Sequence, residues 1–274
     1  MESKSNKYIS IVYMVAGLSS RFGGKVKQFA EVGKNKETLI EISLNQSLKA
    51  GFNKIIFIVG DKTENLFKEK FEDTYKGIPI FYAKQTFDPN KRDKPWGTCD
   101  ALVSAKEIID ENFVVCNGDD LYGENSFKIL FDYLNKENSS ATLGFELGKV
   151  VPDFGGVNRA IYSFDEKNNV LDLKETIGIE KIKFGEMNLT KKTLCSMNIF
   201  ALTKDVILRL EMRLNKFKLM HSNDRKIECY LPVELAELIK DKELNLKLLT
   251  TFDEWMGITN PEDEVLLKEK LAHI

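Results

Sequence analysis

The sequence predicts an α/β fold in which a mixed, mainly parallel sheet has helices on both faces and carries a small extension. Through the first half of the chain, apolar runs of strand length alternate with segments of helical period, which is the pattern of parallel strands joined by helices. Farther on, strand candidates separated by turn signals predict a mixed extension of the sheet. The chain has 274 residues, 43% of them hydrophobic, so it can bury the core that such a fold needs.

The alternation defines the elements of the first half. The predicted strands are Ile9–Val15, Lys54–Val59, Ile80–Tyr82 and Phe113–Asn117. The predicted helices are Thr38–Ala50, Glu64–Glu72 and Cys99–Ile109. Gly51 suits the C-terminus of the first helix, and Thr98 can cap the start of the third. Thr86–Lys94, which ends in a charged cluster, is interpreted as a solvated loop.

The second half changes character. Its predicted strands are Ala141–Leu147, Asn158–Ser163, Val170–Lys174, Cys195–Leu202 and Leu246–Thr251. Its predicted helices are Lys204–Phe217, Leu231–Lys240 and Glu262–Ala272, the last with Pro261 at its first position. Because composition marks no boundary, we treat residues 1–274 as a single domain with halves of about 1–137 and 138–274.

Charge and hydropathy argue against several classes of partner. The 40 basic and 42 acidic residues form no long run of like charge, so we expect no binding to nucleic acid or a membrane surface. No apolar stretch reaches the roughly 20 residues that cross a bilayer, and the polar start Met1–Lys7 lacks the apolar segment of a signal peptide. We expect a cytoplasmic protein with small-molecule partners, and the sequence leaves its oligomeric state open.

Cysteine and histidine supply little chemistry here. The cysteines lie far apart without a C-x-x-C pair, so they predict neither a zinc site nor a disulfide framework. They are Cys99, Cys116, Cys195 and Cys229. With only 2 histidines in the chain, imidazole catalysis is not expected either. Any chemistry must therefore use carboxylates, cations and metal.

The most informative segment is Met14–Gln28, which follows from the first predicted strand. Its small residues let backbone N–H groups approach an anion, and Arg21, Lys25 and Lys27 follow at a spacing that can reach a triphosphate. The segment is not a P-loop, because no Gly-Lys-Ser/Thr follows Gly17 at the required spacing. It is not the dinucleotide-binding motif G-x-G-x-x-G either, because Ser19 stands at the position of the second glycine. Taken alone, it fits a phosphate cradle or an ordinary glycine-rich turn.

Residues Ala16–Phe22, with Lys27 after them, match most of the pattern A-G-G-x-G-[ST]-R-[LF] followed by a lysine. The segment thereby resembles the signature loop of the sugar-phosphate nucleotidyltransferases, the nucleotidyl-diphosphate-sugar pyrophosphorylases. Leu18 and Ser19 depart from the pattern, since the family usually has glycines there. These side chains could narrow the room for backbone around the phosphates.

Further blocks match this family in the same order. Pro95–Leu102 resembles its nucleobase-side G-T-x-x-A motif, and Val114–Asp120 resembles its hydrophobic strand ending in Gly-Asp. Ser196–Phe200 and Glu254–Asp263 continue the resemblance more weakly. The resemblance implies a Rossmann-like, GT-A-type fold whose first half binds a nucleoside triphosphate and whose second half binds a phosphorylated acceptor.

The implied reaction matches these residue types. In nucleotidyl transfer, an acceptor phosphate oxygen attacks the α-phosphorus and pyrophosphate leaves. The nucleophile is already an anion, so the reaction needs cations, a divalent metal and alignment rather than a general base. We assign Arg21 to the triphosphate and Lys27 to charge that develops near the α-phosphoryl group. The other predicted nucleotide-binding residues of this loop are Ala16, Gly17, Leu18, Ser19, Ser20 and Lys25.

Asp119 is the predicted anchor of Mg2+ and the third catalytic residue. It begins the turn after a strand that should point at the ligand crevice, and Mg2+ needs only one or two carboxylates beside phosphate oxygens and water. Gly118 before it is a predicted nucleotide contact. Asp120 after it is assigned to the acceptor, or alternatively caps the helix that starts near Glu124–Ser126.

The base pocket is predicted from the resemblance at Gln85, Trp96, Gly97 and Thr98. Gln85 resembles the glutamine that contacts a pyrimidine edge, and Gly97 lets a base lie against backbone. Trp96 is either a stacking platform or a residue packed on the core. These residues favour a pyrimidine triphosphate, UTP, dTTP or CTP.

On the acceptor side, the resemblance implies contacts from Arg159, Glu175, Met197 and Asn198. One departure concerns the C-terminal block, which in the family often reads W-x-D-x-G-[TS]-P-E and supplies a second metal ligand. Gly257 stands at that aspartate position, so we expect a looser site that requires millimolar Mg2+. Asp253 either replaces the missing ligand or only turns the chain.

The predicted function is Mg2+-dependent transfer of a nucleoside monophosphate from a triphosphate to a sugar 1-phosphate. One alternative is a cytidylyltransferase that acts on a non-sugar phosphate such as phosphocholine. Another, from a different class, is a non-catalytic regulatory or binding subunit of the same fold. Arg21, Lys27 and Asp119 are all present, which argues against the latter.

Overall fold

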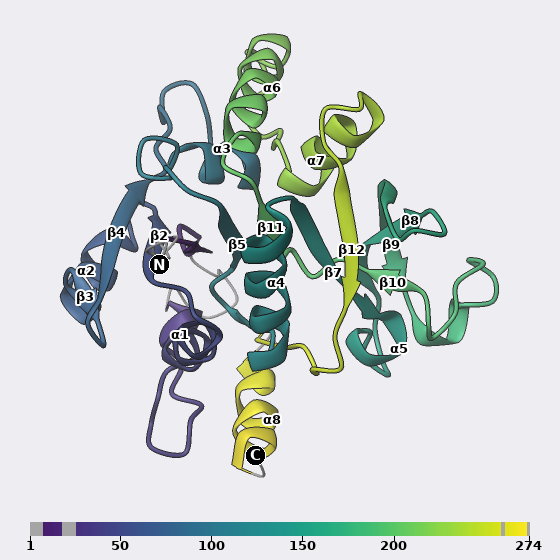
Figure 1. Ribbon diagram of the computed structural model, residues 1–274, viewed down its shortest axis with the longest axis horizontal. Coiled ribbons are helices and arrows are strands. Elements are labelled where there is room, and N and C mark those ends of the chain that lie inside the picture. The colour runs from purple at the N-terminus through teal and green to yellow at the C-terminus, as the bar shows by residue number, and fades with distance from the viewer. Residues whose placement is uncertain (1–7, 18–25, 259–260, 273–274) are drawn as a thin grey trace, which may run out of the picture.

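The computed structural model describes residues 8–17, 26–258 and 261–272 (Figure 1). The strands are β1 (Ser10–Met14), β2 (Lys54–Val59), β3 (Thr74–Tyr75), β4 (Ile78–Lys84), β5 (Phe113–Asn117), β6 (Asp120–Leu121), β7 (Ser140–Glu146), β8 (Val157–Phe164), β9 (Val170–Ile179), β10 (Leu194–Cys195), β11 (Phe200–Leu202), β12 (Leu246–Thr250) and β13 (Met256–Gly257). The helices are α1 (Leu39–Ala50), α2 (Glu64–Phe71), α3 (Thr98–Val103), α4 (Glu124–Glu137), α5 (Leu147–Val150), α6 (Val206–Met220), α7 (Leu231–Lys240) and α8 (Pro261–Ala272), with short 3-10 helices η2 (Lys27–Phe29) and η3 (Lys181–Lys183).

One large sheet runs through both halves of the chain. Its order is β3-β4-β2-β1-β5-β11-β7-β10-β8-β9, and β12 adds to it beside β7. The neighbours β4, β2, β1 and β5 are parallel, whereas β11 is antiparallel to both β5 and β7. The prediction of a mixed, mainly parallel sheet with an extension is confirmed.

Helices cover both faces of the sheet because successive side chains of a strand point to opposite faces. Ile11 and Tyr13 of β1 enter a core cluster with residues of α1, α2 and α4. Val12, between them, enters a second cluster with residues of α3, α6 and α7. The predicted layering is therefore confirmed, and the sheet lies between two hydrophobic cores (Figure 1).

The predicted strand Cys195–Leu202 is interrupted. β10 ends at Cys195 and β11 begins at Phe200, and between them Asn198 adopts a left-handed conformation with φ of 58°. Such a conformation cannot continue a strand, and asparagine is one of the few residues that tolerate it. The predicted helix Cys99–Ile109 is also shorter, because α3 ends at Val103 and turns follow.

The loop after β4 is not simply solvated, which corrects the prediction for Thr86–Lys94. Arg92 is only 3% exposed. Its guanidinium donates to the carbonyl oxygens of Lys94 and Asp224 at 3.1 and 2.8 Å and also to that of Ile227. The loop is thereby attached to the segment between α6 and α7.

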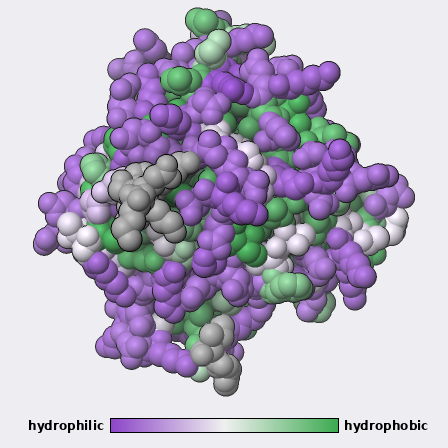
Figure 2. All heavy atoms as spheres, in the orientation of Figure 1, coloured by the Kyte–Doolittle hydropathy of each residue, from purple (hydrophilic) through white to green (hydrophobic). Residues whose placement is uncertain are grey.

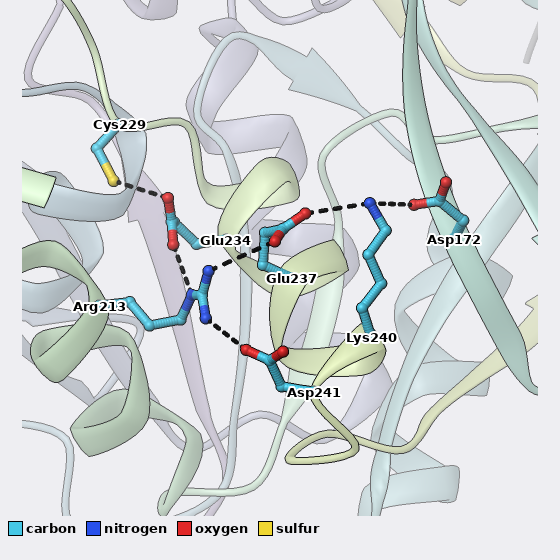
Figure 3. Close-up of polar contacts among 7 residues, drawn as sticks. All are labelled: Asp172, Arg213, Cys229, Glu234, Glu237, Lys240 and Asp241. Carbon is cyan, nitrogen blue, oxygen red and sulfur yellow. Dashed lines mark hydrogen bonds and ion pairs between the residues drawn. The ribbon is translucent and has the colours of Figure 1, made fainter. Parts of the chain in front are cut away.

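A charged network joins α6 to α7 (Figure 3). Arg213 Nε lies 2.7 Å from Glu234 Oε2, and its Nη1 lies 3.0 Å from Asp241 Oδ2. Glu234 Oε1 in turn accepts from the thiol of Cys229 at 3.5 Å. These contacts hold the segment before α7 in place, and this segment packs against α3.

Hydrophilic side chains cover most of the face shown in Figure 2. This agrees with the large number of charged residues in the chain, 40 basic and 42 acidic. Among residues 8–17, 26–258 and 261–272, no helix combines the length and the apolar character needed to cross a membrane.

Candidate active site

The candidate site lies where β1 and β5 end. These parallel neighbours place their C-terminal ends at one edge of the sheet, and the chain leaves β1 toward β2 on one side while β5 lies on the other. In open α/β sheets, such a switch point forms the ligand crevice. A cavity of about 210 Å3 opens here. Predicted residues that line it are Lys27, Asp119, Asp120, Arg159, Glu175, Met197 and Asn198.

Lys27 and Asp119 form an ion pair in this cavity. Lys27 Nζ lies 3.4 Å from Asp119 Oδ2 and donates to the carbonyl oxygen of Ile258 at 3.1 Å. η2 carries Lys27 in from the segment after β1, and Asp119 follows β5 directly. Their side chains are 16% and 30% exposed, so both remain within reach of a ligand.

Asp120 has a different environment from its neighbour. It is buried, and its Oδ2 accepts hydrogen bonds from Asn117 Nδ2 at 2.9 Å and from the Tyr122 hydroxyl at 3.2 Å. Burial, together with the negative charge of Asp119, raises the pKa of Asp120 to about 7. Asp120 does not cap α4, because it belongs to β6 and faces the cavity.

Gly257 has a structural reason to lack a side chain. It pairs with Asp120 across β6 and β13, and a Cβ at residue 257 would lie 2.5 Å from Asp120 Oδ1. It would also lie 2.5 Å from the ring of Trp255. An aspartate at 257 therefore has no room while Asp120 and Trp255 hold these positions.

Asp253, the predicted substitute ligand, lies elsewhere. Its Oδ2 accepts from the backbone N–H of Ser126 at 2.7 Å, and its Oδ1 accepts from Asn125 Nδ2 at 2.9 Å. It lines a separate cavity of about 580 Å3 beside Gly123. Asp253 thus satisfies the N-terminus of α4, as a capping carboxylate does, and the structure does not bring it together with Asp119.

The remaining carboxylates fit a single hard cation. Among the described residues, no group of three or more His, Cys, Asp or Glu side chains could hold a metal ion. Asp119 and Asp120 nevertheless both line the cavity, so two carboxylates lie side by side there. A divalent cation would relieve this repulsion, and carboxylate oxygens are the ligands that Mg2+ prefers.

The acceptor side of the cavity comes from β8 and β9. These strands are antiparallel, and Arg159 and Ala160 lie opposite Thr176 and Glu175. The guanidinium of Arg159 lies 5.5 Å from the Trp255 ring, and its buried Nε has no hydrogen-bond partner among the described residues. Burial raises the pKa of Glu175 above its usual value, and the charge of Arg159 offsets only part of this rise. A cation and a carboxylate thus share one wall of the cavity.

The interruption between β10 and β11 lines the cavity beside β8, where the N–H of Ser196 donates to the carbonyl oxygen of Ala160 at 2.8 Å. The Tyr122 hydroxyl shares its one hydrogen between Asp120 and the carbonyl oxygen of Met197, which lies 2.9 Å away. Ser196 Oγ accepts from the backbone N–H of Asn198 at 3.1 Å. These contacts hold the segment against β6. The break therefore serves the cavity, where Met197 and Asn198 both lie.

The predicted base-side residues lie outside this cavity, around the start of α3. Gly97 has φ of 99°, and a Cβ there would lie 2.6 Å from the carbonyl oxygen of Cys229. Contact with this backbone therefore requires the glycine, whatever else lies against it. Gly97 occupies the N-cap, so Thr98 is not the cap but the first residue of α3, and its Oγ1 accepts from the N–H of Leu231 at 2.9 Å.

Trp96 and Gln85 are held by neighbouring side chains and backbone. The Arg92 guanidinium lies 3.4 Å from the centroid of the Trp96 ring, and Phe217 meets that ring edge-on at 6.2 Å. Trp96 is therefore a packed residue. Gln85 is buried, and its Nε2 donates to the Gly97 carbonyl and to Asp100.

Several predictions concern the loop after β1. Ala16 and Gly17 follow the end of β1. Gly118 packs closely against this segment, because a Cβ at residue 118 would lie 2.3 Å from the Val15 side chain. Residues predicted there that lie outside the described ranges are Leu18, Ser19, Ser20, Arg21 and Lys25.

Sequence reasoning missed several residues that line the cavity. They are Asn117, Asn158, Ala160, Ser196, Trp255 and Ile258. Most are direct neighbours of predicted residues in the chain, so a polar residue beside a motif at a strand end could have indicated them. Trp255 and Ile258 come near Arg159 and Lys27 only through the tertiary fold.

Comparison with known proteins places these features in context. A family model described as nucleotidyl transferase matches residues 24–272. A UTP–glucose-1-phosphate uridylyltransferase, AglF, of Haloferax volcanii is 29% identical over 118 residues, which cover 42% of this chain and 44% of that protein. The chain thus matches less than half the length of this curated relative.

Solved structures show the same fold. A UDP-glucose pyrophosphorylase complexed with UDP-glucose superposes with a TM-score of 0.67 and 15% identity, over 97% of this chain and 99% of that chain. An inositol-1-phosphate CTP transferase from T. maritima superposes with a TM-score of 0.63 and 15% identity, over 96% of both chains. The confirmed Rossmann-like fold therefore extends across almost the whole chain.

Proposed function

Because the chain belongs to the nucleotidyl transferase family, we propose that it transfers a nucleoside monophosphate from a pyrimidine triphosphate to a sugar 1-phosphate and releases pyrophosphate. The observation that carries the proposal is the cavity at the switch point of the sheet. There, Lys27 and Asp119 from the nucleotide half meet Arg159 and Glu175 from the other half. AglF, the uridylyltransferase of glucose 1-phosphate that matches part of this chain, supports this choice of acceptor.

The proposed roles follow from charge and position. Arg159 binds the acceptor phosphate, because its guanidinium is a cation in the cavity with an unpartnered buried N–H. Glu175 and Asn198 accept hydrogen bonds from sugar hydroxyls. Lys27 stabilises charge on the α-phosphoryl group, and its contact with Ile258 holds the ammonium in place before the reaction.

Mg2+ would be held by Asp119, together with phosphate oxygens of the substrate. When bound, it would neutralise charge on the triphosphate and polarise the phosphoryl oxygens. The protein itself aligns the two anionic substrates, since its cations approach the cavity from both halves of the chain. The attacking phosphate oxygen carries its own charge, so no side chain has to remove a proton from it.

A substrate screen tests this function. Pyrophosphate release would be measured for five triphosphates against sugar 1-phosphates and phosphoalcohols, with and without Mg2+. We expect release with a pyrimidine triphosphate and a sugar 1-phosphate, dependent on the metal. Preference for a phosphoalcohol would favour the cytidylyltransferase alternative, and no release under any condition would favour a binding subunit.

Paired variants test the metal anchor. Asp119→Asn should abolish the Mg2+-dependent activity, because the proposed ligand loses its charge. Asp120→Asn should leave a measurable fraction, because Asp120 Oδ2 is already taken up by Asn117 and Tyr122. The reverse pattern would show that Asp120 holds the metal.

A further inference from the structure

We propose that Tyr122 is a positioning residue, whose hydroxyl sets the spacing between the nucleotide side and the acceptor side of the cavity. Tyr122 is fully buried and is not among the described residues that line the cavity, so it acts through its neighbours. This role rests on the function proposed above and deepens it, because it names a residue that aligns the two substrates of that reaction.

The Tyr122 hydroxyl lies where two strands of the sheet separate. β11 is antiparallel to β5, with Phe200 opposite Val115. Continued by two residues, this register would set Asn198 opposite Asn117. β11 begins only at Phe200, however, and Asn198 with its φ of 58° departs from strand conformation. Backbone groups at this break therefore need partners other than those of a regular ladder.

Tyr122 supplies such partners with a single oxygen atom. The backbone N–H of Asn117 donates to the hydroxyl oxygen at 3.2 Å. The hydroxyl shares its own hydrogen between the carbonyl oxygen of Met197 at 2.9 Å and Asp120 Oδ2 at 3.2 Å. The contact with Met197 is the shorter one, and Asp120 Oδ2 has a second donor in Asn117 Nδ2. The hydroxyl thus bridges the end of β5 and the break before β11 in place of a direct ladder hydrogen bond.

The ring of Tyr122 gives the hydroxyl a fixed position. Phe127 of α4 meets the ring edge-on, with the two centroids 5.9 Å apart, and Phe145 of β7 packs on it at 6.3 Å. All three rings belong to one hydrophobic core cluster. Because protein interiors are close-packed, the ring cannot shift to follow a movement of either segment that its hydroxyl joins.

The two sides of this bridge are not held equally. On the nucleotide side, Asn117 pairs with Met14 in the ladder of β5 and β1, and the backbone N–H of Gly118 donates to the Met14 carbonyl oxygen at 3.2 Å. On the acceptor side, Met197 and Asn198 lie between β10 and β11 and both line the cavity. Loss of the hydroxyl should therefore displace the acceptor side and leave the nucleotide side in place.

Tyr122→Phe removes the hydroxyl and keeps the ring. In-line attack requires the acceptor phosphate to be aligned with the α-phosphorus, and a misplacement of about 1 Å can slow a reaction roughly 100-fold. The variant should bind a sugar 1-phosphate roughly 10-fold more weakly and lower kcat roughly 10- to 100-fold. Its affinity for UTP should stay within about twofold of wild type.

Isothermal titration calorimetry measures the two affinities separately. UTP is titrated with Mg2+ present, and the sugar 1-phosphates of the substrate screen, beginning with glucose 1-phosphate, are titrated with a UTP analogue that has a methylene bridge between its α- and β-phosphorus. Pyrophosphate release gives kcat. Tyr13→Phe is the matched control, because Tyr13 is fully buried in the same cluster and its hydroxyl contacts Ser43 and Ser47 of α1. It should leave sugar 1-phosphate binding unchanged.

A double-mutant cycle tests whether Tyr122 acts through the segment at the break. Asn198→Gly removes the amide side chain and tolerates the left-handed backbone. In the Asn198→Gly protein, Tyr122→Phe should weaken sugar 1-phosphate binding by less than about threefold, because coupled residues are not additive. Losses that simply multiply would overturn the proposal. Should Tyr122→Phe fail to fold, Ser196→Ala provides the answer, because it frees the N–H of Asn198 and should show the same selective loss.

The selectivity of the loss separates positioning from a merely structural role. Equal losses of affinity for UTP and for the sugar 1-phosphate in Tyr122→Phe, or an equally large loss in Tyr13→Phe, would overturn the proposal. A selective loss in a protein that binds both ligands without turnover would support the positioning role and overturn the proposed function alone. Failure of the wild-type protein to bind any sugar 1-phosphate of the screen would overturn both.

Discussion

At the residue scale, two adjacent carboxylates differ because of what surrounds them. Asp119 is partly exposed and pairs with Lys27, whereas Asp120 is buried between Asn117, Tyr122 and the backbone of Gly257. The first can take up a cation together with substrate phosphates. Asp120 instead makes its hydrogen bonds within the protein, so these two neighbouring residues have separate roles.

Removing single cations should slow the reaction without unfolding the protein. Lys27→Ala and Arg21→Ala should each lower kcat by a factor on the order of 100, the scale of losing one preorganised electrostatic contact. Steady-state kinetics with circular dichroism as a check on folding provide the measurement. Lys49→Ala, an exposed lysine that pairs with Glu124, is the control. Near-normal kinetics in both test variants would refute the assignment of the loop.

Asp120 should make stability depend on pH. Its pKa is raised to about 7 in the folded protein, by burial and by Asp119, against about 3.9 in an unfolded chain. Between these values the folded state binds more protons, so its free energy of unfolding falls as pH rises from about 4 to about 7. Asp120→Asn cannot ionise and can keep both donors through its Oδ1. Its stability relative to wild type should therefore increase with pH.

Urea unfolding near pH 5 and near pH 8, in the presence of EDTA, measures this difference. The control is Asp132→Asn, because Asp132 is an exposed residue that pairs with Lys128. A gap between Asp120→Asn and wild type that does not change with pH would show that Asp120 is ionised without penalty.

At the scale of elements, the N-terminus of α4 depends on a residue more than 100 positions away in the chain. Asp253 accepts from the N–H of Ser126, in the first turn of the helix. Asp253→Ala should lower the free energy of unfolding by about 1 kcal/mol, the usual effect of losing a cap. The Mg2+ requirement should stay the same, because Asp253 lines a different cavity from Asp119.

Thermal unfolding and a Mg2+ titration of activity together test this role. Glu254→Ala, which removes an exposed ion pair with Lys270, is the control for general surface effects. A higher Mg2+ requirement in Asp253→Ala at unchanged stability would instead make Asp253 the second metal ligand.

At the scale of the whole molecule, one sheet connects the two halves. β5 belongs to the first half and β7 to the second, and β11 pairs with both. Unfolding one half would therefore remove the hydrogen-bond partners of the other. We expect a single cooperative unfolding transition.

The two tryptophans can report on this cooperativity. Trp96 lies in the first half and Trp255 in the second, so Trp255→Phe and Trp96→Phe each leave one fluorescent probe. Their denaturant midpoints should coincide with that from circular dichroism, after correction for the stability of each variant. Separate midpoints would divide the chain into two domains.

The sequence by itself determined the fold class and most element positions. Periodicity is a local property: the run Lys54–Val59 and the segment Leu231–Lys240 were predicted with the bounds that the structure has. It also indicated several polar residues at strand ends, such as Asp119, since the carboxyl ends of parallel strands border the crevice in open α/β sheets.

The tertiary structure alone decided which residues meet. The burial of Arg92 depends on carbonyls of Asp224 and Ile227, far along the chain, and nothing near Arg92 in the sequence indicates them. Asp253 fits a metal ligand by its position after a strand, yet the N-terminus of α4 takes it up. Such contacts depend on the packing of distant segments, which a local pattern of residues does not specify.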